Sequence, residues 1–173
     1  LGTGQDKDNT TIEAGYIGKF AIGNLVWHDA NKNGLNDNGE SVIPNAIVKI
    51  YKDTNMDAIP DGSSIAMDTT DALGLYVFNN LSAGNYIIGV IPPTTVSGTT
   101  YISSGANEVN PNLNVDNNDN GINTIVGETF SGFITLEPTS IEPIGEAPNN
   151  AMAPDAMANL TIDFGFYEGL SIA

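Results

Sequence analysis

The chain contains no cysteine, no arginine and a single histidine, His28, among its 173 residues. Without cysteine it has no disulfides, which small extracellular domains often use for stability. One histidine without any cysteine also leaves too few nitrogen and sulfur ligands for a zinc site. No serine lies in the sequence context of a nucleophile elbow. We therefore expect a protein that is not an enzyme.

Positive charge is scarce as well. Five lysines stand against 21 aspartates and glutamates, which gives a net charge of −16. Such a surface repels nucleic-acid phosphates and anionic membranes, so we expect no nucleic-acid partner. No apolar run is long enough to span a bilayer, and we expect no direct membrane insertion. The apolar fraction of 40% is nevertheless that of a folded domain rather than of a disordered acidic tail.

The acidic residues are concentrated in loops, of which residues 29–40 are the most informative. Counted as a twelve-residue loop, this segment has oxygen-bearing side chains at positions 1, 3, 5, 9 and 12, with glycine at position 6. That is the spacing of a calcium loop, in which position 7 contributes its backbone carbonyl. A polar surface loop is the alternative, since Asn, Asp and Gly favour turns. The spacing predicts a calcium site formed by Asp29, Asn31, Asn33, Leu35, Asp37 and Glu40.

Two more segments carry parts of the same pattern. The first has Ala58 where glycine is expected and Ser64 where a closing carboxylate is expected; its candidate ligands are Asp53, Asn55, Asp57, Ile59 and Asp61. The second has Gly121 at the expected place, but Glu128 comes one residue late; its candidate ligands are Asp116, Asn118, Asn120 and Ile122. Ordinary hairpin loops are the alternative. We therefore expect calcium as the cofactor, at one to three sites.

The residues that flank the first loop favour strands over the helices of an EF-hand. Pro44 would break a helix that began after Glu40. The residues before the loop, 20–27, and those after it, 47–51, are rich in β-branched and aromatic side chains. The loop should therefore join two strands and make their connection rigid.

The rest of the chain indicates an all-β fold, an Ig-like or prealbumin-like sandwich of about seven to eight strands with long calcium-binding loops. No stretch has sustained helical periodicity, and short strands separated by turn residues are typical of sandwiches. Residues 69–78 are interpreted as a hairpin, and residues 93–121 and 137–158 as long loops. The expected strands are 20–28, 45–53, 64–70, 75–80, 84–91, 122–126, 129–136 and 159–167.

The two ends of the chain resemble each other. Residues 9–22 match residues 159–172 at an offset of 150, with several identities. Chance similarity of two short glycine-containing strands is the alternative. A repeat indicates a string of domains or an end-to-end polymer. We expect 1–18 to be the end of a preceding repeat or a terminal donor strand, 19–168 to be the sandwich, and 169–173 to begin the next repeat or a linker.

Several motifs together resemble the B-type repeat domain of bacterial serine–aspartate-repeat surface proteins, in the collagen-adhesin B-like, prealbumin-like superfamily. They lie in residues 22–34, 37–48, 70–86 and 162–166, so the resemblance covers 20–168 almost continuously. It implies a calcium-binding β-sandwich that is repeated in tandem on the cell surface. It also implies a role as a stiff stalk that holds adhesive regions away from the envelope.

Three functions follow as hypotheses. The first is a calcium-stabilised rigid spacer in an extracellular surface adhesin, with neighbouring copies of the same domain as partners and a host or matrix ligand bound by the parent protein. The second is the subunit or averaged repeat of an extracellular filament that assembles end to end. A terminal strand of one copy could then complete the sheet of the next by β-strand addition. The third is a module that binds a carbohydrate or host protein through the two long loops.

Overall fold

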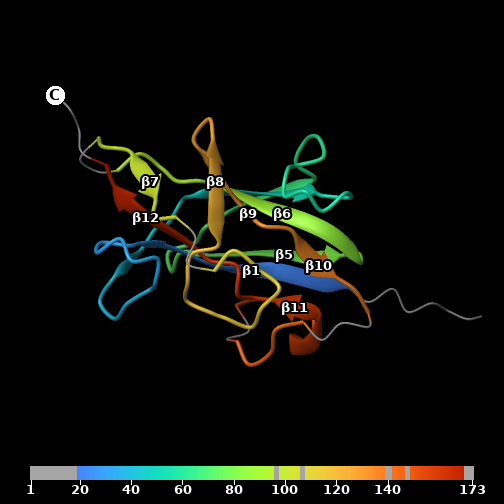
Figure 1. The fold of residues 1–173 in the computed structure, drawn as a ribbon. Coiled ribbons are helices and arrows are strands. Elements are labelled where there is room, and N and C mark those ends of the chain that lie inside the picture. The colour runs from blue at the N-terminus through green and yellow to red at the C-terminus, as the bar shows by residue number, and fades with distance from the viewer. Residues whose placement is uncertain (1–18, 96–97, 106–107, 139–141, 147–148, 170–173) are drawn as a thin grey trace, which may run out of the picture.

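The computed structural model describes residues 19–95, 98–105, 108–138, 142–146 and 149–169. The expected end segments, 1–18 and most of 169–173, lie outside the described residues. Two six-stranded sheets pack face to face, as Figure 1 shows. The expected all-β sandwich is therefore confirmed, although it has more short strands than expected.

The first sheet has the order β11-β1-β12-β7, with β2 and β5 also paired to β1. The second has the order β4-β3-β6-β9-β8, with β10 paired to β6. The first sheet comprises β1 Phe20–His28, β2 Ser41–Val42, β5 Leu75–Leu81, β7 Tyr101–Ser103, β11 Ala158–Asn159 and β12 Phe164–Glu168. The second comprises β3 Ile47–Lys52, β4 Ala66–Thr69, β6 Gly84–Ile91, β8 Gly121–Ile125, β9 Glu128–Ser131 and β10 Ile134–Leu136. One short 3-10 helix, η1 Asp155–Met157, precedes β11, and no helix among the described residues could cross a membrane.

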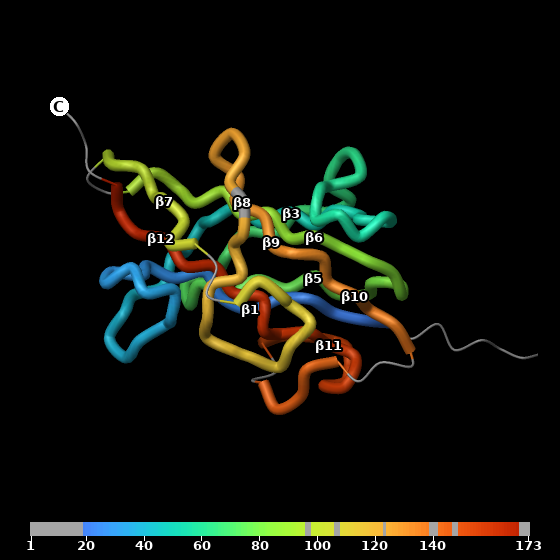
Figure 2. The backbone as a smooth tube through the Cα atoms, in the orientation of Figure 1, coloured from blue at the N-terminus to red at the C-terminus, as the bar shows by residue number. Residues whose placement is uncertain are grey.

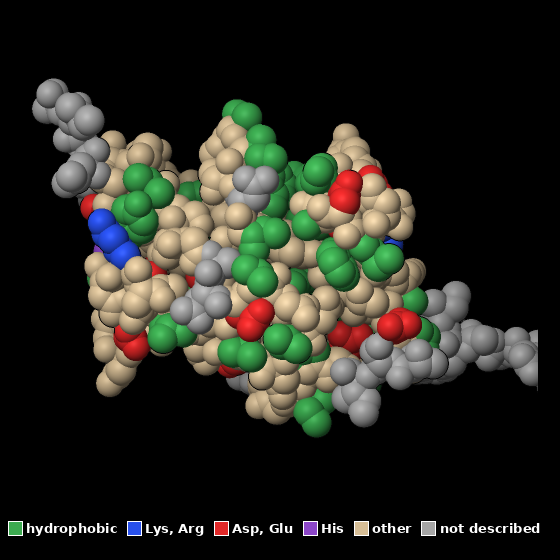
Figure 3. Space-filling model, in the orientation of Figure 1, with side chains coloured by type: hydrophobic (Ala, Val, Ile, Leu, Met, Phe, Trp, Pro, Cys, Tyr) green, Lys and Arg blue, Asp and Glu red, His purple; other side chains and the backbone are tan. Residues whose placement is uncertain are grey.

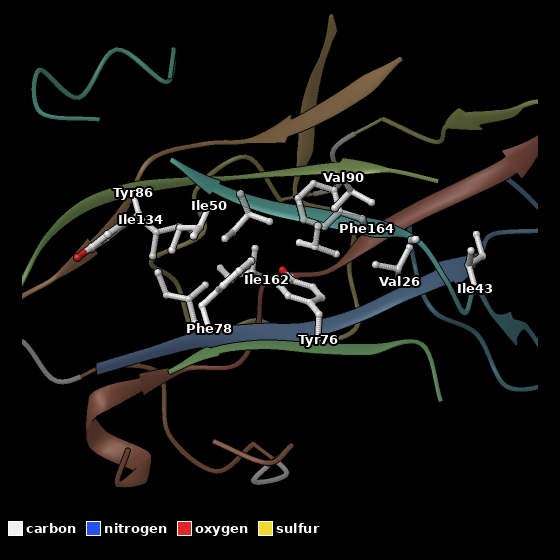
Figure 4. Close-up of a cluster of buried hydrophobic side chains, with 14 of the residues drawn as sticks. Val26, Ile43, Ile50, Tyr76, Phe78, Tyr86, Val90, Ile134, Ile162 and Phe164 are labelled. Atoms are coloured by element: carbon white, nitrogen blue, oxygen red, sulfur yellow. The ribbon is translucent and has the colours of Figure 1, made fainter. Parts of the chain in front are cut away.

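The core lies between the two sheets. Alternate side chains of each strand point inward, because successive residues of a strand face opposite sides. Figure 4 shows Ile50, Tyr86 and Val90 of the second sheet meeting Phe78 and Phe164 of the first. Burial of each such side chain stabilises the fold by about 1.5–3 kcal/mol. The buried Tyr76 hydroxyl donates to the Ile162 carbonyl at 2.7 Å, so its polar atom is satisfied.

The interpretation of residues 69–78 as a hairpin is wrong. β4 pairs with β3 in one sheet and β5 pairs with β1 in the other. The turn at 71–74 therefore carries the chain between the two layers. The Asp68 carboxylate accepts the Val77 N–H at 3.0 Å and so replaces part of the missing strand pairing.

The first and last strands of the sandwich are parallel neighbours. Val26 pairs with Phe164 and His28 with Phe166. The chain therefore enters at the start of β1 and leaves at the far end of β12, on opposite sides of the molecule (Figure 2). Ten residue steps along the strands separate the two points, a distance of about 33 Å.

Candidate calcium-binding loops

The loop of residues 29–40 winds around the carboxylate of Asp29, which follows β1 and is fully buried. Its Oδ1 accepts the N–H groups of Lys32 at 2.6 Å and Asn33 at 3.2 Å, and its Oδ2 accepts that of Gly34 at 2.8 Å. Lys32 and Gly34 have φ values of 63° and 73°, in the left-handed region. Glycine enters this region without steric cost, which explains its place at position 6.

Glu40 closes the loop from its other end. Its Oε2 accepts the indole N–H of Trp27 and the backbone N–H of Asp37, each at 3.1 Å, and its Oε1 accepts the N–H of Ala30 at 2.8 Å. The side chain therefore joins the end of β1 to both halves of the loop. The carboxylates of Asp29 and Glu40 therefore both face the backbone of the loop rather than solvent.

Asp37 is the point on which the two predicted amide ligands converge. The Nδ2 atoms of Asn31 and Asn33 each donate to its Oδ2 at 2.8 Å, and these bonds lower the pKa of the Asp37 carboxyl. A cation at this point would need both amides turned, so that their oxygens face it. Leu35 lies beside them, and its N–H donates to Asn33 Oδ1 at 2.8 Å.

The second predicted loop, 53–61, reproduces the backbone of the first. Buried Asp53 accepts the N–H groups of Asp57 at 3.3 Å and Ala58 at 2.9 Å, which matches the bonds of Asp29 to positions 5 and 6. Met56 and Ala58, at positions 4 and 6 of this loop, both have φ values of 60°. The same positions of the first loop have similar values. Alanine at position 6 thus adopts the left-handed conformation that glycine would take more easily.

The remaining predicted ligands of this loop form hydrogen bonds with other residues of the same loop. Asn55 Nδ2 donates to Asp57 Oδ2 and the N–H of Ile59 donates to Asp57 Oδ1, both at 2.9 Å. Asp61 Oδ2 accepts the hydroxyl of Thr54 and also its N–H at 2.7 Å, and these bonds, the hydroxyl's first, lower the pKa of Asp61. The second loop therefore shares backbone hydrogen bonds and left-handed positions with the first, but it has no carboxylate at its closing position.

The third predicted set does not form such a loop. Asp116 is exposed and accepts the side-chain amide of Asn24 at 2.7 Å, and Ile122 lies in β8. Asn120 is buried; its Oδ1 accepts the N–H of Asp163 at 2.8 Å and its Nδ2 donates to the Glu108 carbonyl at 3.1 Å. Asn118 is also buried, but its Oδ1 has no partner.

This third segment packs directly on the first loop. The N–H of Asp119 donates to the Gly34 carbonyl at 2.8 Å, and Leu35 forms an antiparallel bridge with Asn118. The structure thus brings two of the predicted sites together at one end of the sandwich. The second loop is separate and extends from the end of β3, in the other sheet.

Two buried carboxyl groups at this junction were missed by the sequence reasoning. Asp119 is fully buried with no partner for its Oδ2, and burial, together with the nearby charge of Asp29, raises its pKa to about 7. Asp163 accepts the N–H groups of Leu25 at 3.0 Å and Asn117 at 2.8 Å, and burial raises its pKa well above the usual value. Asp119 could have been found, since it lies between two predicted ligands. Asp163, alone among apolar strand residues, gave no such signal.

The oxygens at the junction are of the kind that calcium prefers. Calcium takes six to eight hard oxygens from carboxylates, amides and backbone carbonyls. Unpaired Asn118 Oδ1 and Asp119 Oδ2 lie beside the first loop and are costly to bury without a partner. Among the described residues, however, no three His, Cys, Asp or Glu side chains form a metal-binding cluster. The three calcium sites therefore stay predictions.

Comparison with known proteins places the chain among cell-surface proteins. Residues 20–131 match the family model of the SdrD B-like domain. Colossin-B of Dictyostelium discoideum is 32% identical over 148 residues, 84% of this chain and 4% of that protein. A fibrinogen-binding protein of Staphylococcus epidermidis is 36% identical over 59% of this chain and 9% of its own length. Serine-aspartate repeat-containing protein D of Staphylococcus aureus (strain Newman) is 34% identical over 68% of this chain and 8% of its own length.

A solved structure, the minor pilin GBS52 of Streptococcus agalactiae, matches 90% of this chain and 47% of its own, with 10% identity and a TM-score of 0.38. The chain thus spans less than a tenth of the length of the curated relatives that it matches.

Proposed function

This chain belongs to the SdrD B-like domain family, and from that premise we propose that it is a calcium-stabilised spacer domain of an extracellular surface protein. The family consists of adhesin-type repeat domains at the cell surface and is not an enzyme family. The observation that carries the proposal is the pair of loops, 29–40 and 53–61. In both, the carboxylate at position 1 accepts the N–H groups of positions 5 and 6, and positions 4 and 6 are left-handed. Two loops of one conformation at matching oxygen spacings are expected if each encloses the same kind of ion.

Calcium would act here by relieving charge at the junction of the first loop with the 116–121 segment. Asp29, Asp119 and Asp163 are all buried, and holding such groups in the ionised form opposes folding unless a cation is near. Asn118 Oδ1 and Asp119 Oδ2 could provide oxygens to the same ion or to a second one. Binding would fix the first loop to the last third of the chain.

The position of the first loop suits a spacer. Asp29 N–H donates to the Phe166 carbonyl at 2.8 Å, and Lys32 Nζ lies 4.1 Å from the Tyr167 ring. The loop thus packs against the end of β12, where the chain leaves the sandwich. A rigid loop at this end would stiffen the connection to a following domain, while the entry point lies about 33 Å away.

The test is thermal unfolding of the chain in excess calcium and in excess chelator. One site held at a hundredfold excess over its dissociation constant stabilises the folded state by about 2.7 kcal/mol. For a domain of this size that corresponds to a rise in Tm of roughly 5–10 °C per site. Equal melting curves in calcium and in chelator would refute the proposal.

The variant Asp37→Asn should separate the effect of calcium binding from the stability of the fold itself. The Asp37 side chain is exposed and its carboxylate accepts hydrogen bonds from two amide side chains, so its loss should change the Tm in chelator by little. We expect the calcium-dependent rise in Tm to shrink in this variant and to stay unchanged in Asp155→Asn, an exposed aspartate outside the loops. A full calcium response in Asp37→Asn would remove the first loop from the proposal.

A tandem arrangement is favoured over a non-covalent filament. Colossin-B matches 84% of this chain with only 4% of its own length, so in that protein the domain is a small part of a much longer chain. The similarity of residues 9–22 to 159–172 fits one unit of such an array. A host ligand would then be bound by the parent protein, as the name of the fibrinogen-binding relative indicates for that protein.

A further inference from the structure

The outward face of the second sheet carries many apolar side chains among a few polar ones such as Thr69, although antiparallel sheets usually present polar side chains on the face that meets water. The strand register places Ile47 beside Ile91, Tyr51 beside Ile87, and Gly89 beside Phe130. It also places Met67 beside Lys49, and Ile125 beside Glu128. We call these residues the sheet face; Ile65, which precedes β4, extends it.

Much of the sheet face is exposed. Met67 is 66% exposed, Ile65 51%, Ile125 48% and Ile47 41%. Between them Tyr51, Ile87 and Phe130 form a separate buried cluster, with the Tyr51 and Phe130 rings 5.8 Å apart. In Figure 3, hydrophobic side chains lie along the upper side of the molecule, between the β8–β9 turn and the loop after β3. Exposed apolar side chains thus flank the buried cluster on both sides of the sheet, and an apolar face of this kind is a candidate interaction site.

The charges on the sheet face cancel. Lys49 Nζ lies 2.9 Å from Glu128 Oε2, and the Tyr51 hydroxyl donates to Glu128 Oε1 at 2.7 Å. Gly89 makes this arrangement possible, because a Cβ there would lie 2.3 Å from Glu128 Oε1. The carboxylate therefore lies across β6. The face has no net charge in a molecule whose net charge is −16.

We propose that the sheet face binds the same face of a second copy of this chain, packed about a two-fold axis. An acidic molecule repels its copies over most surfaces, so a neutral apolar face is where two copies can approach. A two-fold axis brings the same patch of each copy together. It also reverses the Lys49–Glu128 pair, so that the lysine of one copy can face the glutamate of the other. The face is thus complementary to itself.

The size of the sheet face indicates a weak contact for a single domain. Five strands and three rows of side chains cover about 20 Å by 20 Å, or about 400 Å² on each copy. Stable interfaces bury about 800 Å² on each partner. In a chain that carries several such domains, as the proposed function implies, the contacts of two parallel chains would add, and lateral pairing would strengthen with the number of domains.

The test is sedimentation equilibrium of the 173-residue chain up to about 1 mM, in calcium at low and at high salt. We expect a reversible monomer–dimer equilibrium that strengthens with salt, since screening reduces the repulsion of two acidic copies. Met67→Glu and Ile125→Glu should each weaken dimerisation at least tenfold. Their matched controls are Met152→Glu, 76% exposed, and Ile144→Glu, 49% exposed, both outside the second sheet.

Each outcome decides the matter. A dimer lost in the two face variants and kept in the two controls, with all four variants folded by circular dichroism, supports the proposal. A chain that is monomeric throughout overturns it, as does a dimer that survives both face variants or is lost equally in the controls. The result does not depend on the melting experiment, so failure of the calcium proposal would be distinguishable from failure of this one.

Discussion

Single aspartates set the course of the two similar loops. Asp29 and Asp53 are buried at the ends of β1 and β3, and each accepts backbone N–H groups from positions 5 and 6 of its own loop. Such bonds satisfy donors that would otherwise be unpaired in a tight turn. The carboxylate therefore has a structural role before any cation binds. For this reason Asp37 is a better site than Asp29 for separating metal binding from folding.

Glu142 is a buried carboxyl group outside the predicted calcium loops. It is only 4% exposed, its Oε1 has no partner, and it lines a cavity of about 320 Å³ together with Asn112, Phe133 and Glu137. Burial, with the charge of Glu137, raises the pKa of Glu142 to about 7. The folded state thus holds this proton more tightly than the unfolded state does.

A carboxyl whose pKa rises on folding weakens the fold as the pH increases. The penalty for Glu142 should be absent below about pH 4, grow up to about pH 7, and stay constant above that. We expect Glu142→Gln to have the wild-type Tm at pH 4 and a higher one at pH 8, by about 2–4 °C for each kcal/mol gained. Melting curves at both pH values check this, with the exposed Glu168→Gln as control. Equal Tm values of the variant and the wild type at pH 8 would contradict it.

At the scale of strands, glycine fixes how closely neighbours approach. Gly23 of β1 lies where a Cβ would be 2.4 Å from the Tyr76 carbonyl oxygen of β5. Gly89 of β6 lies equally close to an obstacle, but there the nearest atom is the end of the Glu128 side chain. A paired backbone carbonyl cannot move without breaking the β1–β5 ladder, whereas a side chain can rotate away.

The two glycines should therefore differ when replaced by alanine. We expect Gly23→Ala to destabilise by about 3 kcal/mol or more, and Gly89→Ala by about 1–3 kcal/mol, as for other overpacked sites. Urea denaturation of both variants measures the difference. Gly89→Ala should in addition displace the Glu128 carboxylate from Lys49 and Tyr51. A second variant, Glu128→Gln, removes the charge of that carboxylate and should reproduce part of the same loss of stability. The reverse order of stabilities would show that the strands can separate at β5.

The elements predicted best from the sequence are those with local signals. The strands β1, β3, β5 and β6 were predicted within a few residues, and a loop does begin at Asp29, whereas its calcium site stays a prediction. What could not be predicted depends on distant pairing. β4 and β5 look like a hairpin locally, but the pairing of β4 with β3 and of β5 with β1 decides their sheets. The junction of Asp119 with Asp29 likewise joins segments about ninety residues apart, which spacing alone cannot reveal.

For the whole molecule, the parallel pairing of β1 with β12 determines how copies can be linked. Entry and exit at opposite ends make each domain extend a chain rather than fold it back. The net charge of −16 acts in the same direction, because neighbouring domains repel one another at distances within the Debye length, about 8 Å in physiological salt. An array of such domains should therefore be extended, and calcium should limit bending at the end where the first loop lies.

This predicts the length of a tandem protein. Two copies of residues 19–168 in one chain should have a maximum dimension, by small-angle X-ray scattering, that exceeds that of one copy by at least the distance of about 33 Å between entry and exit. Chelator should broaden the distance distribution of the two-domain protein, since the first loop without calcium should hold the end of β12 less rigidly. A one-domain control should change far less. A two-domain protein that is no longer than one domain would mean that the units pack side by side, against the proposed spacer.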